Sequence, residues 1–260
     1  MTQLLDRGVI EGISKIVSSK GRLLHFPLIH STNHYFLESD EFLEGPPIFI
    51  LADSQTEGHG RRGRVWLDQP GSSLLLTVGL FRNSADFITW IPLAVGLALY
   101  DVLEEIGVVT DLKWPNDLLF NRKKICGILC ESRQQGGSFK IAIGVGMNIL
   151  FSPDSSGISL IEALKQSSVH LDPKRWRVDF ISRVILDIFK WVSLCESNSG
   201  VEKIKLEWER KSFLMNRRVR VSSQENPVVV LGLDFEGALK VQAEDGSVLA
   251  LHSDEVSLWV

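Results

Sequence analysis

The chain changes character after Ser212, and this change constrains its architecture more than any other feature. The remaining residues offer only short β-prone runs, at Val219–Val221, Val228–Leu233, Ala238–Gln242, Val248–Leu251 and Val256–Trp259. Two turn-forming triplets that end in glycine, Phe235–Gly237 and Glu244–Gly246, lie between such runs. Because no helical spacing fits there, residues 212–260 are expected to form a small β-barrel.

The preceding residues mix helical and strand patterns. Apolar residues at helical spacing mark Leu4–Val17, Phe87–Gly107, Arg175–Cys195 and a stretch ending near Lys211, and an N-cap at Ser31 opens a helix to Ser39. Strand patterns mark Leu23–Ile29, Ile48–Ala52, Ser72–Leu80, Asp111–Trp114, Asp117–Phe120, Lys124–Ser132 and Phe139–Ile149. These patterns predict an α/β domain to which the small barrel is appended.

The bulk composition is that of an ordinary globular protein, with 44% hydrophobic and 23% charged residues. A net charge of −4 gives no reason to expect nucleic-acid binding. Cys126, Cys130 and Cys195 are too few for a disulfide scaffold and lack partners for a zinc site, so we interpret them as buried thiols. Neither a signal peptide nor a membrane span is recognisable, which predicts a cytoplasmic protein without membrane contact.

The segment Gly58–Arg64, which reads Gly-His-Gly-Arg-Arg-Gly-Arg, is the most unusual in the chain. Its glycines let the backbone turn sharply and point N–H groups into one concavity, which suits an anion. Its arginines supply planar forks that bind phosphate or carboxylate oxygens. An Arg-Gly cluster taken alone is more often a solvated basic loop, and this one lacks the Gly-Lys-Ser/Thr ending of a P-loop.

Two further segments carry candidate polar groups. In Lys113–Asp117 (Lys-Trp-Pro-Asn-Asp) a turn places Lys113 and Asp117 on either side, although an incidental surface ion pair worth about 0–1 kcal/mol is the alternative. Lys124 is followed by Gly127 at the entry of a buried strand, which on its own is an ordinary strand entry.

The strand Ile143–Ile149 carries the last candidate group. Gly144, Gly146 and Asn148 share one face of it. Bare backbone beside an amide is a surface for a flat ring, and tight helix packing is the equally good alternative.

The order and spacing of these segments closely resemble the biotin protein ligases. The match comprises Ser31–Asn33, Gln55, the Gly58–Arg64 loop followed by Trp66, Lys113–Asp117, Lys124 with Gly127, and Gly144–Asn148. The Lys-Trp-Pro-Asn-Asp string and the Gly-x-Gly-Arg-x-Gly-Arg loop are highly specific in combination. The resemblance implies an α+β fold, with a mixed-sheet catalytic domain over 1–211, of which 1–23 is a helical extension, and an SH3-like β-barrel over 212–260.

The resemblance also implies an ATP-dependent ligase, of the type without a DNA-binding domain. It would activate biotin as biotinyl-5′-AMP and transfer it to a lysine of the biotin carboxyl carrier protein of acetyl-CoA carboxylase. Biotin would contact Ser31, Thr32, Asn33, Gln55, His59, Gly60, Arg61, Lys124 and Gly127. ATP or the adenylate would contact Arg61, Arg64, Trp66, Lys113, Asn116, Gly144, Gly146 and Asn148. The catalytic residues would be Lys124, Arg61, Lys113 and Asp117, with Asp117 also contacting Mg²⁺.

One loop position departs from the family pattern. The family loop usually reads Gly-Arg-Gly-Arg, and His59 stands here in place of its first arginine. If this position acts through its backbone N–H, the change has no effect. If its side chain neutralises charge, affinity or pH dependence will differ, because histidine is only partly charged near neutrality.

Two other functions stay open. A lipoate or octanoate ligase or transferase has the same fold, and a thioester-forming transferase would need a cysteine such as Cys126 or Cys130. The Lys113–Asp117 string and the paired glycines favour biotin. A biotin-sensing repressor is the second alternative, but about two dozen residues before the catalytic segment are too few for a helix-turn-helix, so DNA binding is not expected. The oligomeric state, a homodimer included, stays open.

Overall fold

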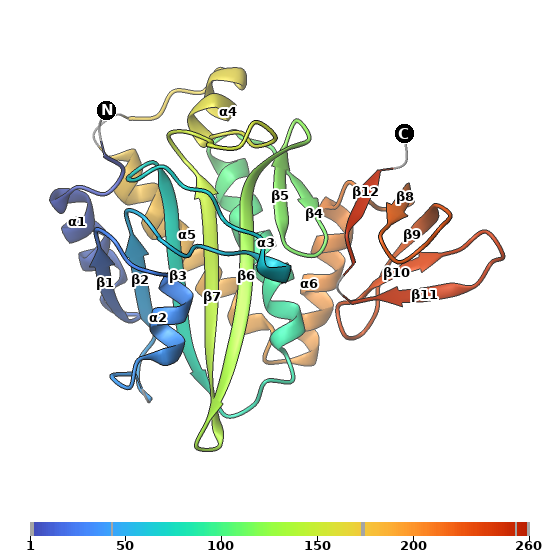
Figure 1. Ribbon diagram of the computed structural model, residues 1–260, viewed down its shortest axis with the longest axis horizontal. Helices are drawn as coiled ribbons and strands as arrows, with labels where there is room; N and C mark the ends of the chain where they lie inside the picture. Colours follow the sequence, from blue (N-terminus) through green and yellow to red (C-terminus); the bar gives the residue numbers. More distant parts are fainter. Residues whose placement is uncertain (1–2, 43, 173–174, 253, 259–260) are drawn as a thin grey trace.

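Figure 1 shows the computed structural model of the chain, which describes residues 3–42, 44–172, 175–252 and 254–258. The α-helices are α1 (Arg7–Val17), α2 (Thr32–Glu38), α3 (Ile91–Glu105), α4 (Leu160–Gln166), α5 (Trp176–Leu194) and α6 (Asn198–Lys211). The first strands are β1 (Arg22–Phe26), β2 (Ile48–Ala52), β3 (Ser73–Arg82), β4 (Asp111–Lys113), β5 (Asp117–Phe120), β6 (Lys123–Gln135) and β7 (Ser138–Asn148). The later strands are β8 (Arg218–Val221), β9 (Val228–Leu233), β10 (Leu239–Gln242), β11 (Val248–Leu251) and β12 (Val256–Leu258).

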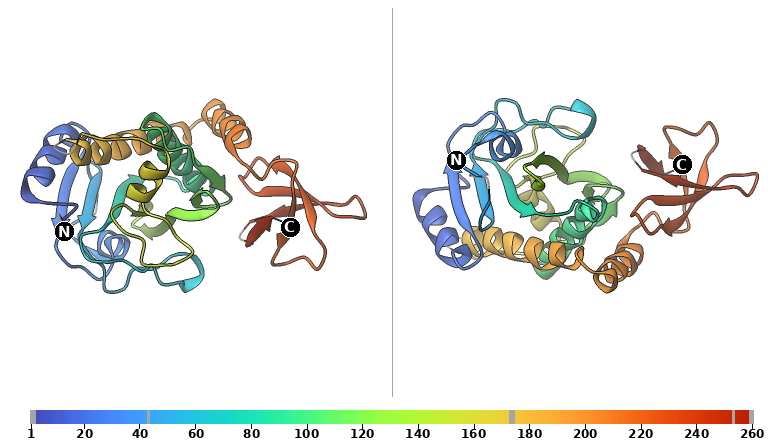
Figure 2. Two further views of the ribbon diagram at one scale, coloured as in Figure 1. Left: turned by 90° about the horizontal axis from the view of Figure 1, so that it is seen from above. Right: turned by 90° about the horizontal axis from the view of Figure 1, so that it is seen from below.

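A seven-stranded mixed sheet forms the centre of the larger part, in the order β1-β2-β3-β7-β6-β5-β4. Only β1 and β2 run parallel, and every other neighbouring pair is antiparallel. Helices α1, α3 and α5 cover one face, and α2 packs on the other face against β2, β3 and β7 (Figure 2). The expected α+β fold with a mixed sheet is therefore confirmed.

Strand β2 is covered on both faces, and all five of its residues are buried. Phe49 and Leu51 belong to the main core beneath the long helices, whereas Ile48 and Ile50 pack with Phe36 of α2 on the opposite face. Because successive side chains of a strand point to opposite faces, a strand covered on both faces must be apolar at every position.

Helix α3 is buried along most of its length, although the sequence pattern indicated an apolar face only. It contacts β6 on one side and both α5 and α6 on the other, so few of its residues reach solvent. The helix begins at Ile91 rather than Phe87, after a short 3-10 turn at Ile88–Trp90. Gly107 ends the segment as expected and has a φ of +81°.

The N-terminal residues belong to the same core. Asp6 caps α1 by accepting a hydrogen bond from the backbone N–H of Val9 at 2.9 Å. Leu4 and Ile13 are fully buried, and α1 packs against α5 and β1. The helical extension that the sequence predicted is thus a structural part of the larger unit.

The C-terminal strands form a five-stranded antiparallel sheet in the order β11-β10-β9-β8-β12, which confirms the expected small β-unit. Gly237 and Gly246 have φ values of +80° and +85°, so both predicted turns need glycine. Trp259, the last residue of the predicted final strand, lies outside the described residues. Among the helices that the structure describes, none is long and apolar enough to cross a membrane.

The end of strand β1 and the presence of helix α4 both differ from the sequence interpretation. Strand β1 ends at Phe26 rather than Ile29, because Pro27 has no backbone N–H to continue the ladder. Helix α4 was not predicted at all. Its start nevertheless carries a sequence signal, since Ser159 and Glu162 form a reciprocal capping box.

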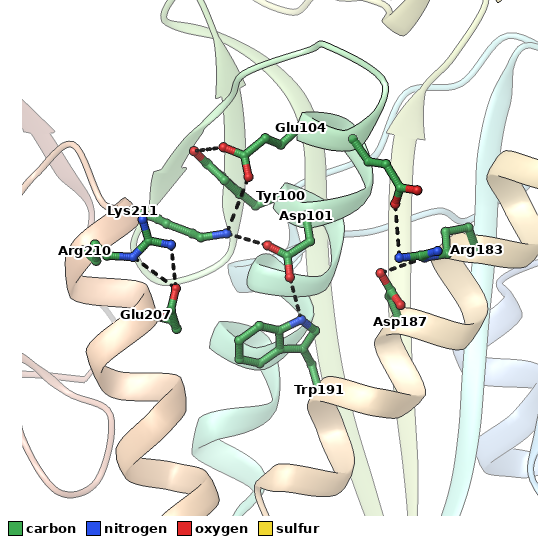
Figure 3. Close-up of polar contacts among 10 residues, drawn as sticks. Tyr100, Asp101, Glu104, Arg183, Asp187, Trp191, Glu207, Arg210 and Lys211 are labelled. Carbon is green, nitrogen blue, oxygen red and sulfur yellow. Dashed lines mark hydrogen bonds and ion pairs between the residues drawn. The ribbon is translucent and has the colours of Figure 1, made fainter.

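A polar cluster anchors α6, the helix that leads into the β-unit, to α3 (Figure 3). The Lys211 side chain is only 7% exposed, pairs with Asp101, and lies 3.9 Å from a carboxylate oxygen of Glu104. Its ammonium also lies 4.2 Å from the ring centre of Tyr100, and Trp191 of α5 donates to Asp101 at 3.0 Å. These contacts fix the end of α6 directly before the β-unit begins.

We expect Lys211→Met to lower the free energy of unfolding by about 1–3 kcal/mol, because it leaves Asp101 without its buried cation. The partial exposure of Asp101 keeps this below the cost for a fully buried pair. Urea unfolding measures the loss. Lys15→Met on α1 is the control, where an exposed lysine outside the cluster should cost below about 0.5 kcal/mol. Equal losses in the two variants would contradict the anchoring role of Lys211.

Candidate functional site

One cavity of about 370 Å³ lies between the sheet, the Gly58–Arg64 loop and the β-unit. Every site residue predicted from the sequence lines it: Ser31, Thr32, Asn33, Gln55, His59, Gly60, Arg61, Arg64, Trp66, Lys113, Asn116, Asp117, Lys124, Gly127, Gly144, Gly146 and Asn148. These residues come from segments that are far apart in the chain. The fold therefore gathers the whole predicted set into one place.

The start of α2 forms one end of the cavity. Ser31 is its N-cap, and its hydroxyl accepts a hydrogen bond from the backbone N–H of His34 at 3.4 Å. The side-chain oxygen of Gln55 accepts from the backbone N–H of Thr32 at 2.7 Å and lies 3.1 Å from the Thr32 hydroxyl. Gln55 thus ties the chain before the loop to the first turn of α2.

Asn33 is held from three sides. Its amide oxygen accepts from the buried hydroxyl of Thr77 on β3 at 2.6 Å. Its amide nitrogen donates to a carboxylate oxygen of Glu131 at 2.8 Å and to the carbonyl of Leu129 at 3.1 Å. Because both N–H groups of the amide are used by the protein, the structure fixes the orientation of Asn33.

The Gly58–Arg64 loop folds back on itself. The backbone N–H of Gly60 donates to the carbonyl of Arg64 at 2.7 Å, and that of Trp66 donates to the carbonyl of Gly58 at 2.9 Å. Arg62 and Gly63 at the tip have φ values of 58° and 69°, in the left-handed region. Gly63 adopts this conformation without strain, whereas residues with a Cβ, such as Arg62, adopt it rarely.

The three loop arginines differ in their partners. Arg64 pairs with Glu255 of the β-unit, and Arg62 lies 3.8 Å from the same carboxylate. Arg61 faces the cavity, where it donates to the side-chain oxygen of Asn116 at 3.5 Å. Burial lowers the pKa of the Arg61 guanidinium, which nevertheless stays charged because its ordinary pKa is far above neutrality. Arg61 is therefore a cation held by a neutral partner.

The residues in the middle of Lys113–Asp117 make contacts with other parts of the protein. The turn contains a cis peptide bond before Pro115, and Trp114 donates from its indole to the carbonyl of Gly237 in the β-unit at 3.2 Å. Asn116 donates to the carbonyl of Ile128 on β6 at 2.7 Å. The string thus joins β4 and β5 to the β-unit and to β6 around the edge of the cavity.

Asp117 forms an ion pair with Lys124 rather than with Lys113, the pair that the turn alone had suggested. The ammonium of Lys124 lies 2.7 Å from Oδ1 of Asp117 and 5.5 Å from the ring centre of Trp66. Lys113 and Asp117 are opposite backbone partners in the β4–β5 ladder. No hydrogen bond or ion pair joins the Lys113 side chain to any residue that the structure describes. Lys113 is thus a cavity-lining cation available for a ligand.

The paired glycines of β7 make room for side chains that line the cavity. A Cβ at Gly146 would lie 2.6 Å from the Trp66 indole, and one at Gly144 would lie 2.7 Å from the Asn33 amide. The flat ring that Gly146 accommodates is therefore the indole of Trp66. The Nε1–H of Trp66 is buried without a hydrogen-bond partner among the described residues. An acceptor on a bound molecule would satisfy it.

We expect Gly146→Ala to lower the free energy of unfolding by about 1–3 kcal/mol, because the added Cβ overlaps the indole of Trp66. Chemical denaturation of the variant measures this cost. Gly60→Ala is the control, since its Cβ would come no nearer than 3.8 Å to any atom outside its chain neighbours. A destabilisation by Gly146→Ala no greater than that of the control would contradict the close approach of Trp66.

Charges of both signs meet in the cavity. The lining cations are Arg61, Arg62, Arg64, Lys113 and Lys124, and the lining carboxylates are Asp117, Asp154, Asp254 and Glu255. Because Lys124, Arg62 and Arg64 face carboxylates, the cations left over are Arg61 and Lys113. Neither of them forms an ion pair with a residue that the structure describes, and the lining cations outnumber the lining carboxylates by five to four, so the cavity favours an anionic ligand.

The cysteines lie outside this cavity. Cys126 and Cys195 are buried as expected, whereas Cys130 is only partly buried, because it lies where β6 faces the β-unit turn near Gly237. Burial raises the pKa of the Cys126 and Cys130 thiols, so both stay protonated and weakly nucleophilic. Within the described residues, no group of three or more His, Cys, Asp or Glu side chains could hold a metal ion.

Several lining residues were missed by the sequence reasoning. The loop after β7 contributes Pro153, Asp154, Ser156 and Gly157, and the β-unit contributes Asp254, Glu255 and Val256. The loop is fixed by Asn148, which donates to the hydroxyl of Ser152 at 3.2 Å. Its only sequence signal is a cluster of Ser, Pro, Asp and Gly, which marks a loop without placing it.

The part of the chain that contributes most of the cavity also matches a known protein family. The model described as the biotin/lipoate A/B protein ligase family matches residues 25–148, which span the site from the strand before α2 to Asn148.

Two relatives and one solved structure are similar over most of this chain. The biotin–protein ligase of Homo sapiens is 31% identical over 219 residues, which cover 80% of this chain and 30% of that protein. The biotin–[acetyl-CoA-carboxylase] ligase of Paracoccus denitrificans is 28% identical over 227 residues, which cover 83% of this chain and 92% of that protein. A biotin protein ligase of Aquifex aeolicus, solved in complex with biotin and ATP, superposes with a TM-score of 0.72. It is 27% identical and covers 91% of this chain and 98% of its own.

Proposed function

Because the chain belongs to the biotin/lipoate A/B protein ligase family, we propose that it activates biotin with ATP and transfers it to a protein lysine. The observation that carries this proposal is the cavity itself, which combines both predicted substrate regions. Its α2 end presents Ser31, Thr32 and Gln55, and its other end presents the loop and turn cations. One space can thus hold an uncharged polar ring and, beside it, two anionic groups.

The first step joins two anions, and this decides what the protein must supply. The carboxylate of biotin attacks the α-phosphorus of ATP, and pyrophosphate leaves. Two unit charges at about 4 Å repel by roughly 4 kcal/mol at an effective dielectric near 20. Arg61, Lys113 and Lys124 line the place where these charges meet and would offset the repulsion. Lys124, which Asp117 holds before reaction, would also stabilise the charge that develops in the transition state.

Lys124 is the best-placed of these cations. Its backbone is bonded to the loop after β7, since Ile158 donates to its carbonyl at 2.9 Å, and its ammonium is held by Asp117. A cation fixed at both ends needs little reorganisation when a carboxylate oxygen approaches. We assign Lys124 to the carboxyl end of biotin and Lys113 to the phosphates of ATP.

The nucleotide would use the free donor of Trp66 and the wall near Asn148. Mg²⁺ would be held by Asp117 together with phosphate oxygens, because Mg²⁺ commonly takes one or two carboxylates plus substrate phosphates. Oδ1 of Asp117 is already paired with Lys124 at 2.7 Å, so the other carboxylate oxygen, Oδ2, is the candidate ligand for a metal that arrives with the nucleotide. Bound there, Mg²⁺ would neutralise phosphate charge.

The second step transfers the activated acid. The amine of a carrier lysine attacks the carbonyl of biotinyl-AMP, an amide forms, and AMP leaves. The mixed anhydride is prone to hydrolysis, so the Gly58–Arg64 loop would exclude water until the carrier binds. We propose the biotin carboxyl carrier domain of acetyl-CoA carboxylase as this partner, and residues 1–211 and 212–260 as the two domains that form the site.

A lipoate or octanoate ligase is the second candidate, because the family includes such enzymes. The thioester-forming variant of this chemistry is disfavoured, since neither Cys126 nor Cys130 lines the cavity. Competition binding separates the two acids. Biotin should displace a bound biotin probe, and lipoate at the same concentration should not. Displacement by lipoate alone would identify lipoate, rather than biotin, as the substrate.

A further inference from the structure

Glu131 on β6 contacts two residues that line the cavity, Asn33 and His59. Neither the sequence motifs nor the proposed chemistry gives Glu131 a role. Its Oε2 accepts from the amide of Asn33 at 2.8 Å. Its Oε1 lies 3.4 Å from Nε2 of His59 in the Gly58–Arg64 loop. One carboxylate thus connects the start of α2 to the loop.

The contact with Asn33 continues into a chain of polar groups. Asn33 accepts from Thr77, and the Thr77 hydroxyl lies 2.8 Å from the hydroxyl of Thr32. Thr32 is in turn bonded to Gln55 through its backbone N–H at 2.7 Å. This series of hydrogen bonds therefore includes three of the residues expected to contact biotin, Gln55, Thr32 and Asn33, and ends at Glu131.

The other ring nitrogen of His59 lies 3.1 Å from the backbone carbonyl of Glu57. A carbonyl and an ionised carboxylate can only accept hydrogen bonds. Because a neutral imidazole donates from one nitrogen only, both contacts are satisfied together only when His59 is doubly protonated. In that form His59 restores the positive charge that the family's arginine carries at this place.

The surroundings of His59 contain charges of both signs. The loop itself contributes Arg61, Arg62 and Arg64, and β6 contributes Glu131. The side chain of Glu57 faces His30, with 3.5 Å between its carboxylate and Nδ1. Glu131 is thus the carboxylate that contacts the His59 side chain itself.

We propose that Glu131 is a positioning residue that holds the Gly58–Arg64 loop through protonated His59 and links the loop to the residues that bind the acid's ring. The link to the ring-binding residues rests on the proposed function, whereas the contact between Glu131 and the loop does not. Because loss of one proton leaves His59 a single donor for these two acceptors and removes its ion pair with Glu131, a rise in pH loosens the loop. Loop closure would then depend on pH in a way that a permanently charged arginine would not produce.

Trypsin cleavage after Arg61, Arg62 and Arg64, followed by mass spectrometry of the ligand-free protein, measures how often the loop opens. The informative quantity is the cleavage rate of Glu131→Gln divided by that of the wild type at the same pH. At pH 6 we expect this ratio to be about two to five, as for the loss of one partly exposed ion pair. At pH 8 it should fall to one, because the glutamine amide can donate to neutral His59.

The double variant Glu131→Gln with His59→Ala separates coupling from general loosening. Measured against His59→Ala alone, it should cleave at an equal rate at both pH values. His59→Gln, which keeps a donor, should cleave more slowly than His59→Ala. The matched control is Glu38→Gln, an exposed glutamate at the end of α2 outside the cavity, with an expected ratio of one.

Two results would overturn the inference: a ratio of one at pH 6, or a ratio that is the same at pH 6 and pH 8. A second readout tests the link to the substrate, because Glu131→Gln should raise the KM for biotin at pH 6 and leave kcat nearly unchanged. If the wild type shows no reaction with biotin at all, the proposed function fails, and the cleavage ratios still decide the role of Glu131.

Discussion

Replacing Lys124 with alanine should slow formation of biotinyl-AMP by about 10²–10³-fold, the usual cost of losing one preorganised donor to developing charge. Lys124 is the cation whose ammonium is fixed by Asp117 at 2.7 Å inside the cavity. Lys123, the adjacent lysine in the sequence, is exposed at the start of β6 and cannot take its place. Single-turnover formation of the adenylate, followed with radioactive ATP, measures the effect.

Lys123→Ala is the matched control for this variant, since it removes an adjacent lysine that does not line the cavity. Its adenylation rate should stay within about twofold of the wild type, as expected for an exposed residue. Circular dichroism should show that both variants stay folded. Full activity of Lys124→Ala would remove the central catalytic assignment.

Arg61→Gly should increase the rate at which free biotinyl-AMP escapes by about 10–100-fold, because hydrogen bonds to charged groups contribute about 1.5–3 kcal/mol. Arg61 is half-buried, lines the cavity and is bonded only weakly to Asn116 at 3.5 Å. Its guanidinium is therefore available for the carboxylate and phosphate of the adenylate. A chase with unlabelled biotin after adenylate formation measures the escape.

The control for the arginine variant is Arg122→Gly. Arg122 is exposed in the turn between β5 and β6 and has a φ of 65°, a conformation that glycine adopts without strain. Its replacement should leave escape unchanged. If Arg61→Gly retained the adenylate as long as the wild type, the loop would not be the lid of the site.

The sequence predicted much of the lining of the candidate site because these residues lie in short, specific strings. Lys113–Asp117 and Gly58–Arg64 each combine turn-forming residues with charged ones, and both strings line the cavity. The strands were also predictable, since β2 is apolar at every position and the C-terminal strands are separated by glycine turns. These signals are local and are therefore readable from one chain.

The unpredicted parts depend on contacts between distant segments. Asp117 pairs with Lys124 because β5 and β6 are neighbours, and the turn alone suggested Lys113 instead. Gly146 makes room for Trp66, which comes from a loop much earlier in the chain. Glu255 reaches the loop because the fold places the β-unit beside it. Spacing along a chain contains no information of this kind.

The most direct test of the proposed function is release of pyrophosphate from ATP and Mg²⁺ in the presence of biotin, with lipoate and octanoate measured in parallel. We expect release with biotin and none above background with the other two acids, because Ser31, Thr32 and Gln55 offer polar groups to a ring. Release with lipoate or octanoate alone would keep the fold and the adenylation chemistry but refute the substrate. Absence of release with all three acids, from protein that still binds biotin, would contradict the proposal that this cavity is an adenylating site.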